Sequence, residues 1–306
     1  MARHLGIRAA LGAVTIAGVV VLTFVLMFVV PGDPARGIAG PRADAETLAL
    51  VRANLHLDGS LATQLWSYMS GIVRGDLGVS YVRREPVTDL LAARLPATAI
   101  LACAGLALSV VLGSALGVWD GLRPRRSRLL ATINVGLLSI PTFSMGFTLL
   151  LIFGYKLSLF PITGGTGAAN LVLPAVTLAL WGVPYYASVV RDGMQEVLAA
   201  PYTRTAVGKG LPRRAVITGH VLRNALSPVV TMVGLDFAIY MSGVVFVENV
   251  FAWPGIGQLQ TQAFGDLDRP VLMGTVVVAA VIVVAANLAA DTARMFLDPR
   301  TREQPA

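Results

Sequence analysis

The stretch AALGAVTIAGVVVLTFVLMFVV, at residues 9–30, runs for 22 residues without a charged side chain. A helix of about 20 apolar residues is long enough to cross the hydrocarbon core of a bilayer. Arg3 and Arg8 precede the stretch, as in a secretory signal peptide, but a signal core has only about 7–15 apolar residues and ends at an A-x-A-like cleavage site, which is absent here. The sequence therefore predicts a retained transmembrane helix.

Five further segments have the length and apolar character of membrane spans. They lie between Arg94 and Asp120, between Arg128 and Lys156, and near residues 171–190, 229–247 and 271–290. Mean hydropathy is +0.71 and only 13% of residues are charged, whereas soluble domains carry about 25%. We therefore expect an all-α polytopic membrane protein with six transmembrane helices. Pro141, among hydroxyl-bearing neighbours, predicts a kink in the third span.

The distribution of Lys and Arg predicts the orientation of these spans. With the N-terminus in the cytoplasm, 15 cations fall in short cytoplasmic segments and two, Lys156 and Arg269, in short outer loops. Cations accumulate in loops that stay in the cytoplasm, so both termini are predicted to be cytoplasmic. This also accounts for the net charge of +7. No basic stretch is interleaved with aromatic residues, so we expect no nucleic-acid partner.

These spans divide the chain into four parts. Residues 1–30 form a cytoplasmic N-terminus and the first span, 31–95 an extracytoplasmic loop, 96–292 a core of spans two to six with a cytoplasmic loop at 191–226, and 293–306 a cytoplasmic tail. Within the outer loop, Asp44 and Glu46 predict a capped helix, and GDLG at residues 75–78 predicts a turn. Apolar residues at 87, 90, 91 and 95 share one helical face and predict a helix lying in the membrane interface.

No group of side chains in the sequence indicates catalysis or a metal site. Cys103 is the only cysteine, which excludes a disulfide framework and a thiolate cluster. Gly208 and Lys209 are not part of a phosphate-binding loop, because Thr203 takes the first glycine position and Gly210 the hydroxyl position. His220 has no second metal ligand at a suitable spacing, which favours a structural hydrogen bond. We predict a non-catalytic chain with no metal or cofactor of its own.

Asp236 is the one clear charge inside a predicted span. A carboxylate at mid-bilayer costs on the order of 2.5–3.5 kcal/mol on insertion scales, so Asp236 is expected to face the bundle interior or a water-filled pathway. Tyr240 and Gly243 follow it on the same helical face. Two interpretations stay open. Asp236 lines a substrate pathway and attracts a cationic group such as a peptide α-amine, or it makes a buried hydrogen bond to Ser, Thr or Asn on a neighbouring span.

The loop at residues 191–226 has the pattern of short helices outside the membrane. Pro201 suits the first turn of a helix, residues 202–209 supply two turns, and Gly210, Leu211 and Pro212 end it. Residues 213–225 predict a second helix with Val216, Val221 and Ala225 on an apolar face. A rigid helix between two spans transmits a force applied to it to both of them.

This loop resembles the EAA signature of binding-protein-dependent ABC importer permeases, in the form Y-x-R-T-A-x-x-K-G-L…H-x-x-x-N-A-x-x-P of the dipeptide, oligopeptide and nickel branch. The matching residues are Tyr202, Arg204, Thr205, Ala206, Lys209, Gly210, Leu211, His220, Asn224, Ala225 and Pro228. Four other segments of this chain also resemble the same branch: PGDP (31–34), GDLG (75–78), VENVFAWPGIG (247–257) and DPR (298–300). The N-terminal pattern favours the B-type subunit of the pair. Pro201 and Val207 depart from the pattern, which usually has an acidic and a basic residue there.

The resemblance implies the type I importer permease fold in a bacterial plasma (inner) membrane, surrounded by lipid. It implies a homologous second permease, two ABC ATPases that bind ATP and Mg, and an extracytoplasmic binding protein. Di- and oligopeptides are the expected substrates, with nickel chelates, glutathione or another small solute as alternatives, and a self-contained secondary transporter as a rival class. The substrate pathway is assigned to Asp236 and Tyr240. ATPase coupling is assigned to Glu196, Tyr202, Arg204, Thr205, Ala206, Lys209, Gly210 and Leu211.

Overall fold

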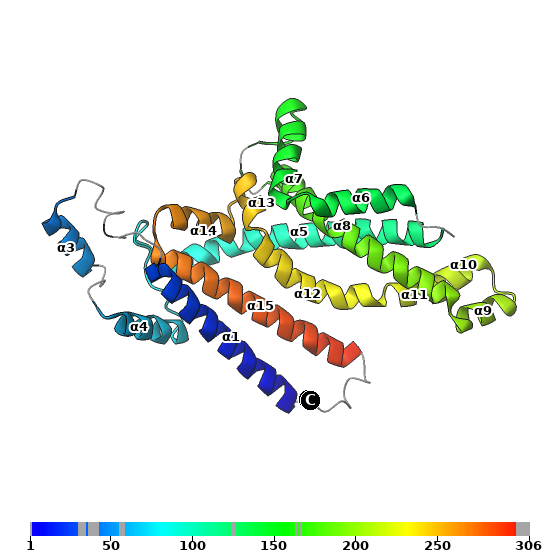
Figure 1. The fold of residues 1–306 in the computed structure, drawn as a ribbon, viewed down its shortest axis with the longest axis horizontal. Helices are drawn as coiled ribbons and strands as arrows, with labels where there is room; N and C mark the ends of the chain where they lie inside the picture. The colour runs from blue at the N-terminus through cyan, green and yellow to red at the C-terminus, as the bar shows by residue number, and fades with distance from the viewer. Residues whose placement is uncertain are drawn as a thin grey trace. The chain divides into compact units, whose positions relative to one another are not determined.

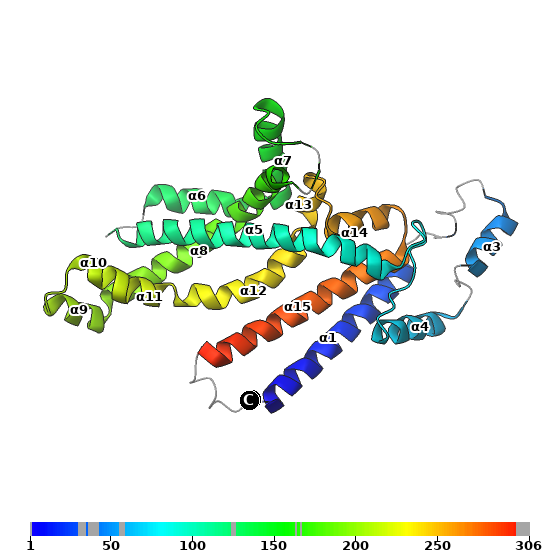
Figure 2. The same ribbon diagram turned by 180° about the vertical axis from the view of Figure 1, so that it is seen from behind.

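A computed structural model of the chain describes residues 2–29, 35, 43–54, 59–123, 127–162, 164–165 and 167–297. Apart from one isolated antiparallel bridge between Val79 and Pro86, every regular element in these residues is helical (Figures 1 and 2). The motifs at residues 31–34 and 298–300 lie outside the described residues.

Along the chain the helices are α1 (Ala2–Val29), α3 (Ala45–Asn54), α4 (Leu61–Val73), α5 (Val87–Gly121), α6 (Arg128–Ser139), α7 (Thr142–Leu149), the π-helix η1 (Leu150–Lys156), α8 (Ala168–Ala199), α9 (Pro201–Gly208), α10 (Arg213–Val216), the π-helix η2 (Ile217–Val221), α11 (Leu222–Ala225), α12 (Ser227–Gly243), α13 (Val245–Val250), α14 (Ile256–Gly265) and α15 (Arg269–Leu297).

Five stretches of helix are long and apolar enough to cross a membrane, namely Gly6–Met27, Val87–Gly121, Ala168–Ala199, Arg213–Met241 and Arg269–Ala289. The pair Arg128–Ser139 and Thr142–Lys156 passes the same test together but is bent by 102°. Ile140 is extended (φ −90°, ψ 124°), as expected for a residue before a proline. The predicted kink at Pro141 is thus confirmed, and the described residues contain six spans if the bent pair counts as one.

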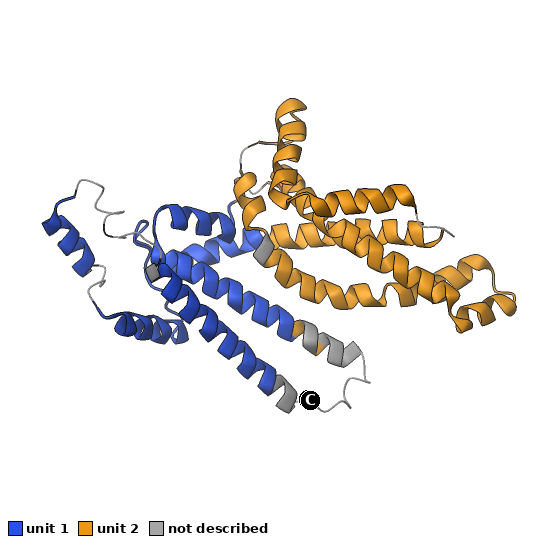
Figure 3. Cartoon of the chain, in the orientation of Figure 1, with its two compact units in different colours: residues 1–98, 254–288 blue, residues 99–253, 289–306 orange. Residues whose placement is uncertain are grey.

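The chain folds into two compact units (Figure 3). Unit 1 comprises Met1–Thr98 and Pro254–Leu288, and unit 2 comprises Ala99–Trp253 and Ala289–Ala306. Unit 1 therefore contains α1, α3, α4, the start of α5, α14 and most of α15. Unit 2 contains the rest of α5 and the helices from α6 to α13.

The core of unit 1 is built on the first turns of α5. Val87 and Leu91 are 0% and 3% exposed and belong to one cluster with Leu259 of α14 and Val271 of α15. Residues 87–95 are therefore the beginning of α5, and their apolar face packs inside unit 1. Side chains from α14 and α15, distant in sequence, cover this face, whereas the predicted place of the segment in the membrane interface stays a prediction.

The loop between α4 and α5 is held by a buried carboxylate. Asp268, 3% exposed, accepts hydrogen bonds from the Ser80 hydroxyl (2.5 Å) and the Tyr81 N–H (3.1 Å). Gly75 and Gly78 have φ of 79° and 85°, which confirms the predicted turn. Asp44 accepts a hydrogen bond from the Thr47 N–H (2.8 Å) at the start of α3, which confirms the predicted cap. Hydrogen bonds from Thr47 hold the pKa of Asp44 below its usual value.

In unit 2, α5 and α8 approach closely along a row of glycines on α5. A Cβ added to Gly113 would lie 2.6 Å from the Tyr186 Cβ and 2.8 Å from the Val183 carbonyl oxygen. Added Cβ atoms at Gly105, Gly117 and Gly121 would also come within 2.8 Å of α8 atoms. Small residues allow membrane helices to pack with their backbones in near contact. The sequence analysis did not predict this interface.

Candidate coupling site and substrate pathway

Helix α9 is joined to the end of α8 by one extended residue. Ala200 (φ −63°, ψ 144°) separates the two helices, and Pro201 takes the first helical position of α9, as predicted. The Thr203 hydroxyl donates a hydrogen bond of 2.7 Å to the Val197 carbonyl in the last turn of α8. Thr203 is 3% and Ala206 7% exposed, so one face of α9 packs inside unit 2.

The opposite face of α9 is open. Tyr202 is 49% exposed, Val207 59% and Leu211 43%. Gly210 has φ of 81°, a left-handed conformation that ends the helix where the sequence predicted. The exposed members of the predicted coupling set are Glu196, Tyr202, Arg204, Thr205, Lys209, Gly210 and Leu211, and Ala206 alone of that set is buried. The structure thus gathers these residues on and beside one short helix.

The segment after α9 returns along α8. Val216, Val221 and Ala225 are at most 3% exposed, which confirms the predicted apolar face. Asn224 donates a hydrogen bond of 2.8 Å to the backbone carbonyl of His220, whose side chain is exposed. Among the described residues, His220 and the other potential ligands form no group that could hold a metal ion.

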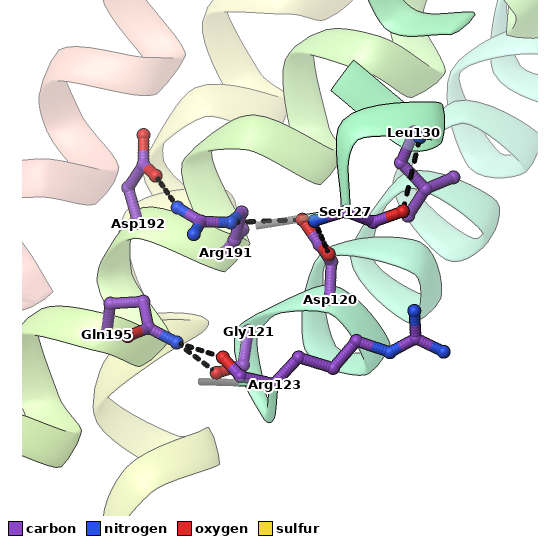
Figure 4. A network of polar contacts seen from close by, with 8 residues as sticks. All are labelled: Asp120, Gly121, Arg123, Ser127, Leu130, Arg191, Asp192 and Gln195. Atoms are coloured by element: carbon purple, nitrogen blue, oxygen red, sulfur yellow. Dashed lines mark hydrogen bonds and ion pairs between the residues drawn. The ribbon is translucent and has the colours of Figure 1, made fainter. Parts of the chain in front are cut away.

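A polar network ties α8 to the ends of α5 and α6 (Figure 4). The Arg191 Nε lies 3.0 Å from the Asp120 Oδ2, and the two side chains are 16% and 6% exposed. The other carboxylate oxygen of Asp120 accepts from the Ser127 N–H (2.9 Å). The Ser127 hydroxyl in turn caps α6, accepting from the Leu130 N–H (3.4 Å).

Gln195, one turn after Arg191, extends this network. Its side-chain amide donates to the carbonyl of Gly121 (2.5 Å), the last residue of α5, and to that of Arg123 (3.2 Å), just after the helix (Figure 4). Carbonyls at a helix C-terminus lack partners within the helix, and Gln195 supplies one. The sequence analysis counted Arg191 only as a topological cation and did not single out Asp120 or Gln195. In the sequence, the charge of Asp120 at the end of a predicted span was the one feature that could have indicated this network.

Asp236 and Tyr240 on α12 both reach neighbouring helices. The Tyr186 hydroxyl of α8 donates to the Asp236 Oδ2 (2.5 Å). The Tyr240 and Ser109 hydroxyls lie 2.6 Å apart, and the Tyr240 ring meets Trp181 edge-on at 5.8 Å. Tyr240 is only 3% exposed, whereas Asp236 is half-buried. Tyr240 on α12 therefore packs against α5 and α8, and the hydrogen-bond partner of Asp236 is Tyr186, whereas the second of the two open interpretations named Ser, Thr or Asn.

Two family models together match nearly the whole sequence. Residues 95–303 match the "Binding-protein-dependent transport system inner membrane component" family, and residues 1–102 match the N-terminal part of such membrane components. The chain belongs to this family of ABC importer permeases. The permease is thus a multi-pass protein of the inner membrane, and both the resemblance stated above and the all-α fold are confirmed.

Curated relatives match the permease over almost its full length. It is 38% identical over 286 residues to the glutathione transport system permease protein GsiC of Escherichia coli (strain K12), covering 92% of this chain and 93% of the relative. GsiC of Salmonella paratyphi A is 37% identical over 292 residues, covering 94% and 95%. A crystal structure of an amino acid ABC transporter with histidines shares the fold, with a TM-score of 0.52, 13% identity and coverage of 70% of this chain and 94% of that one.

Proposed function

We propose that this permease is the non-catalytic half of a translocation pathway for short peptides, glutathione included. A homologous second permease forms the other half, two ABC ATPases bind ATP and Mg, and an extracytoplasmic binding protein delivers the substrate. Two relatives are named glutathione permeases, and glutathione is a tripeptide. This supports the peptide class over nickel chelates, and the family membership disfavours a self-contained secondary transporter.

The observation that carries this function is the attachment of α9. One face of α9 is exposed and the other is bonded to α8 through Thr203 and Val197. We propose that the exposed face docks in a groove of a partner ATPase, with the predicted coupling residues at the contact. Motion of α9 then reaches α8 directly, and reaches α5 and α6 through Asp120, Arg191 and Gln195.

Photo-crosslinking in the assembled transporter tests the docking proposal. A photoreactive residue replacing Val207, which is 59% exposed on α9, is expected to capture an ATPase subunit. The matched control replaces Val73, which is 88% exposed on α4, and is expected to capture none. Neither replacement is expected to disturb packing, because both native side chains are exposed. Capture at neither position, or equally at both, would contradict the docking of α9.

We propose that Asp236 lines the pathway and attracts the cationic group of the substrate. Its half-burial supports this role, because part of the Asp236 side chain stays open to a substrate, and the assignment of Tyr240 to the pathway stays a prediction. Asp236→Asn is expected to lower uptake of a cationic peptide about tenfold, equivalent to about 1.4 kcal/mol, and uptake of a neutral peptide much less. The measurement is uptake into proteoliposomes, with substrate-stimulated ATP hydrolysis as the control for assembly. Equal losses for both peptides would leave Asp236 with a purely structural bond to Tyr186.

A further inference from the structure

Helix α4 in unit 1 runs for 13 residues, LATQLWSYMSGIV, without a charged side chain. It begins at Ser60, whose hydroxyl accepts from the Thr63 N–H (3.3 Å), and ends before Arg74. Although the helix is apolar, none of its residues is buried. A helix of this kind in contact with water on all its free sides would expose an unusual amount of apolar surface.

Three distinct faces run along α4. Tyr68 and Ile72 pack against the core cluster of unit 1, which includes Val20 of α1. Trp66 and Val73, seven residues apart and so on one face, are 77% and 88% exposed. Ala62, four residues before Trp66, is exposed on the same face.

The third face of α4 is polar. Thr63 and Ser67, four residues apart, are both exposed, and Ser70 follows three residues later. Around the helix axis, the order is therefore a packed face, an exposed apolar face and an exposed polar face. This division matches the environments at a membrane surface, where a peripheral helix has protein beside it, acyl chains below and water above.

The position of α4 in unit 1 agrees with a place at the membrane surface. Tyr68, Met69 and Ile72 pack on the same cluster as Met27, close to the end of the candidate span Gly6–Met27. Figures 1 and 2 both show one end of α4 beside α1, on the half of α1 that leads toward α3. The end of a span is where the hydrocarbon core gives way to headgroups, and tryptophan is enriched at that level.

We propose that α4 is an amphipathic helix that lies in the lipid–water interface of the bilayer. Ala62, Trp66 and Val73 face the acyl chains, and Thr63 and Ser67 face water. The exposed Trp66 favours lipid as the occupant of the apolar face, because α4 packs beside the end of the α1 span and tryptophan is enriched at that level of the membrane. The helix anchors the outer part of unit 1 at a fixed depth beside α1.

Spin-label accessibility tests this placement without depending on transport. The assembled transporter is placed in lipid nanodiscs, and the permease carries Cys103→Ser, which removes the only cysteine of this chain. Trp66→Cys and Val73→Cys probe the apolar face, and the adjacent Ser67→Cys and Thr63→Cys are matched controls on the polar face. Each nitroxide is then relaxed by oxygen, which concentrates in lipid, or by a water-soluble nickel chelate.

Labels at positions 66 and 73 are expected to collide several-fold more often with oxygen than with the nickel chelate, and labels at 63 and 67 to show the reverse. Nickel access at position 66 equal to that at 67 would place α4 in water and overturn the proposal. Low access to both reagents at 66 and 73 would mean that a protein partner covers the helix, which also overturns it. Stimulated ATP hydrolysis by each labelled complex confirms that the variants assemble.

Discussion

At the scale of single residues, a few polar pairs connect helices in the described part of unit 2. Asp120 with Arg191 and Tyr186 with Asp236 each join α8 to another helix. Such pairs contribute specificity more than net stability, because the desolvation of charged groups offsets much of their attraction. Removing one partner of a charged pair nevertheless lowers stability, because the remaining charge stays buried without its counter-charge.

Asp120→Asn is expected to destabilise the permease by about 1–3 kcal/mol, because Arg191 then lacks its buried counter-charge. The measurement is thermal unfolding of the detergent-solubilised complex. Asp192→Asn is the matched control. Asp192 contacts the same arginine at 2.9 Å but is 66% exposed, so its loss is expected to change stability by less than about 0.5 kcal/mol.

Equal losses of stability in the two variants would show that the buried Asp120–Arg191 pair contributes no more to stability than the exposed Asp192–Arg191 pair. A coupling role for the pair adds a second expectation. Asp120→Asn is expected to lower uptake per ATP hydrolysed, because α5 and α6 then follow α8 less closely. A variant with reduced stability but unchanged uptake per ATP would limit the pair to a structural role.

At the scale of elements, the close approach of α5 and α8 determines which residues can meet. The glycines of α5 bring its backbone against Tyr186 and Met194 of α8, and this contact sets the distance at which Arg191 reaches Asp120. Helix association in lipid depends on such packing, because lipid tails remove the hydrophobic driving force between helices. The geometry of the network of Asp120, Arg191 and Gln195 therefore depends on these glycines, and the carbonyl of one of them, Gly121, also accepts a hydrogen bond in it.

Gly113→Ala is expected to destabilise the permease by about 1–3 kcal/mol, because the added methyl group meets the Val183 backbone oxygen, which cannot move aside. Gly136→Ala in the middle of α6 is the matched control. Nothing lies within 4 Å of a Cβ at that position, so the change is expected to be neutral or to stabilise the helix by up to about 1 kcal/mol. Thermal unfolding of both variants makes the comparison, and destabilisation of both alike would count against the close α5–α8 contact.

At the scale of the whole molecule, we propose that the permease receives force from partner ATPases. The sequence lacks a phosphate-binding loop, and the exposed face of α9 is the part of unit 2 that we propose to meet the motor. The family matches extend over both compact units. The two units together therefore make up one subunit of an importer, and the transport cycle belongs to the assembly.

The purified permease alone is expected to hydrolyse no ATP. The complex with its second permease and both ATPases is expected to hydrolyse ATP faster when the binding protein loaded with glutathione or a dipeptide is added. A nickel chelate with the same binding protein is expected to give no stimulation. Hydrolysis by the permease alone, or stimulation by the nickel chelate only, would overturn the corresponding part of the proposed function.

The features that depend on neighbouring residues could be predicted from the sequence. Apolar segments of sufficient length predict the spans, and Pro201 and Gly210 predict the two ends of α9, because a proline ring and a left-handed φ act on the local backbone. The bend at Pro141 follows for the same reason. The orientation of the termini and the four-part division of the chain stay predictions.

Only the tertiary structure decided which side chains meet. Gln195 and Gly121 are 74 residues apart, and Tyr186 and Asp236 are 50 apart, so no local pattern links them. The periodicity at residues 87–95 predicted an apolar face, and only the structure shows that α14 and α15 cover it while apolar residues of α4 stay exposed. Periodicity shows that a helix has an apolar face, whereas burial depends on which distant helices pack against it. The 22 uncharged residues at 9–30 therefore predict a span by themselves, whereas the helices that pack against that span depend on the tertiary structure.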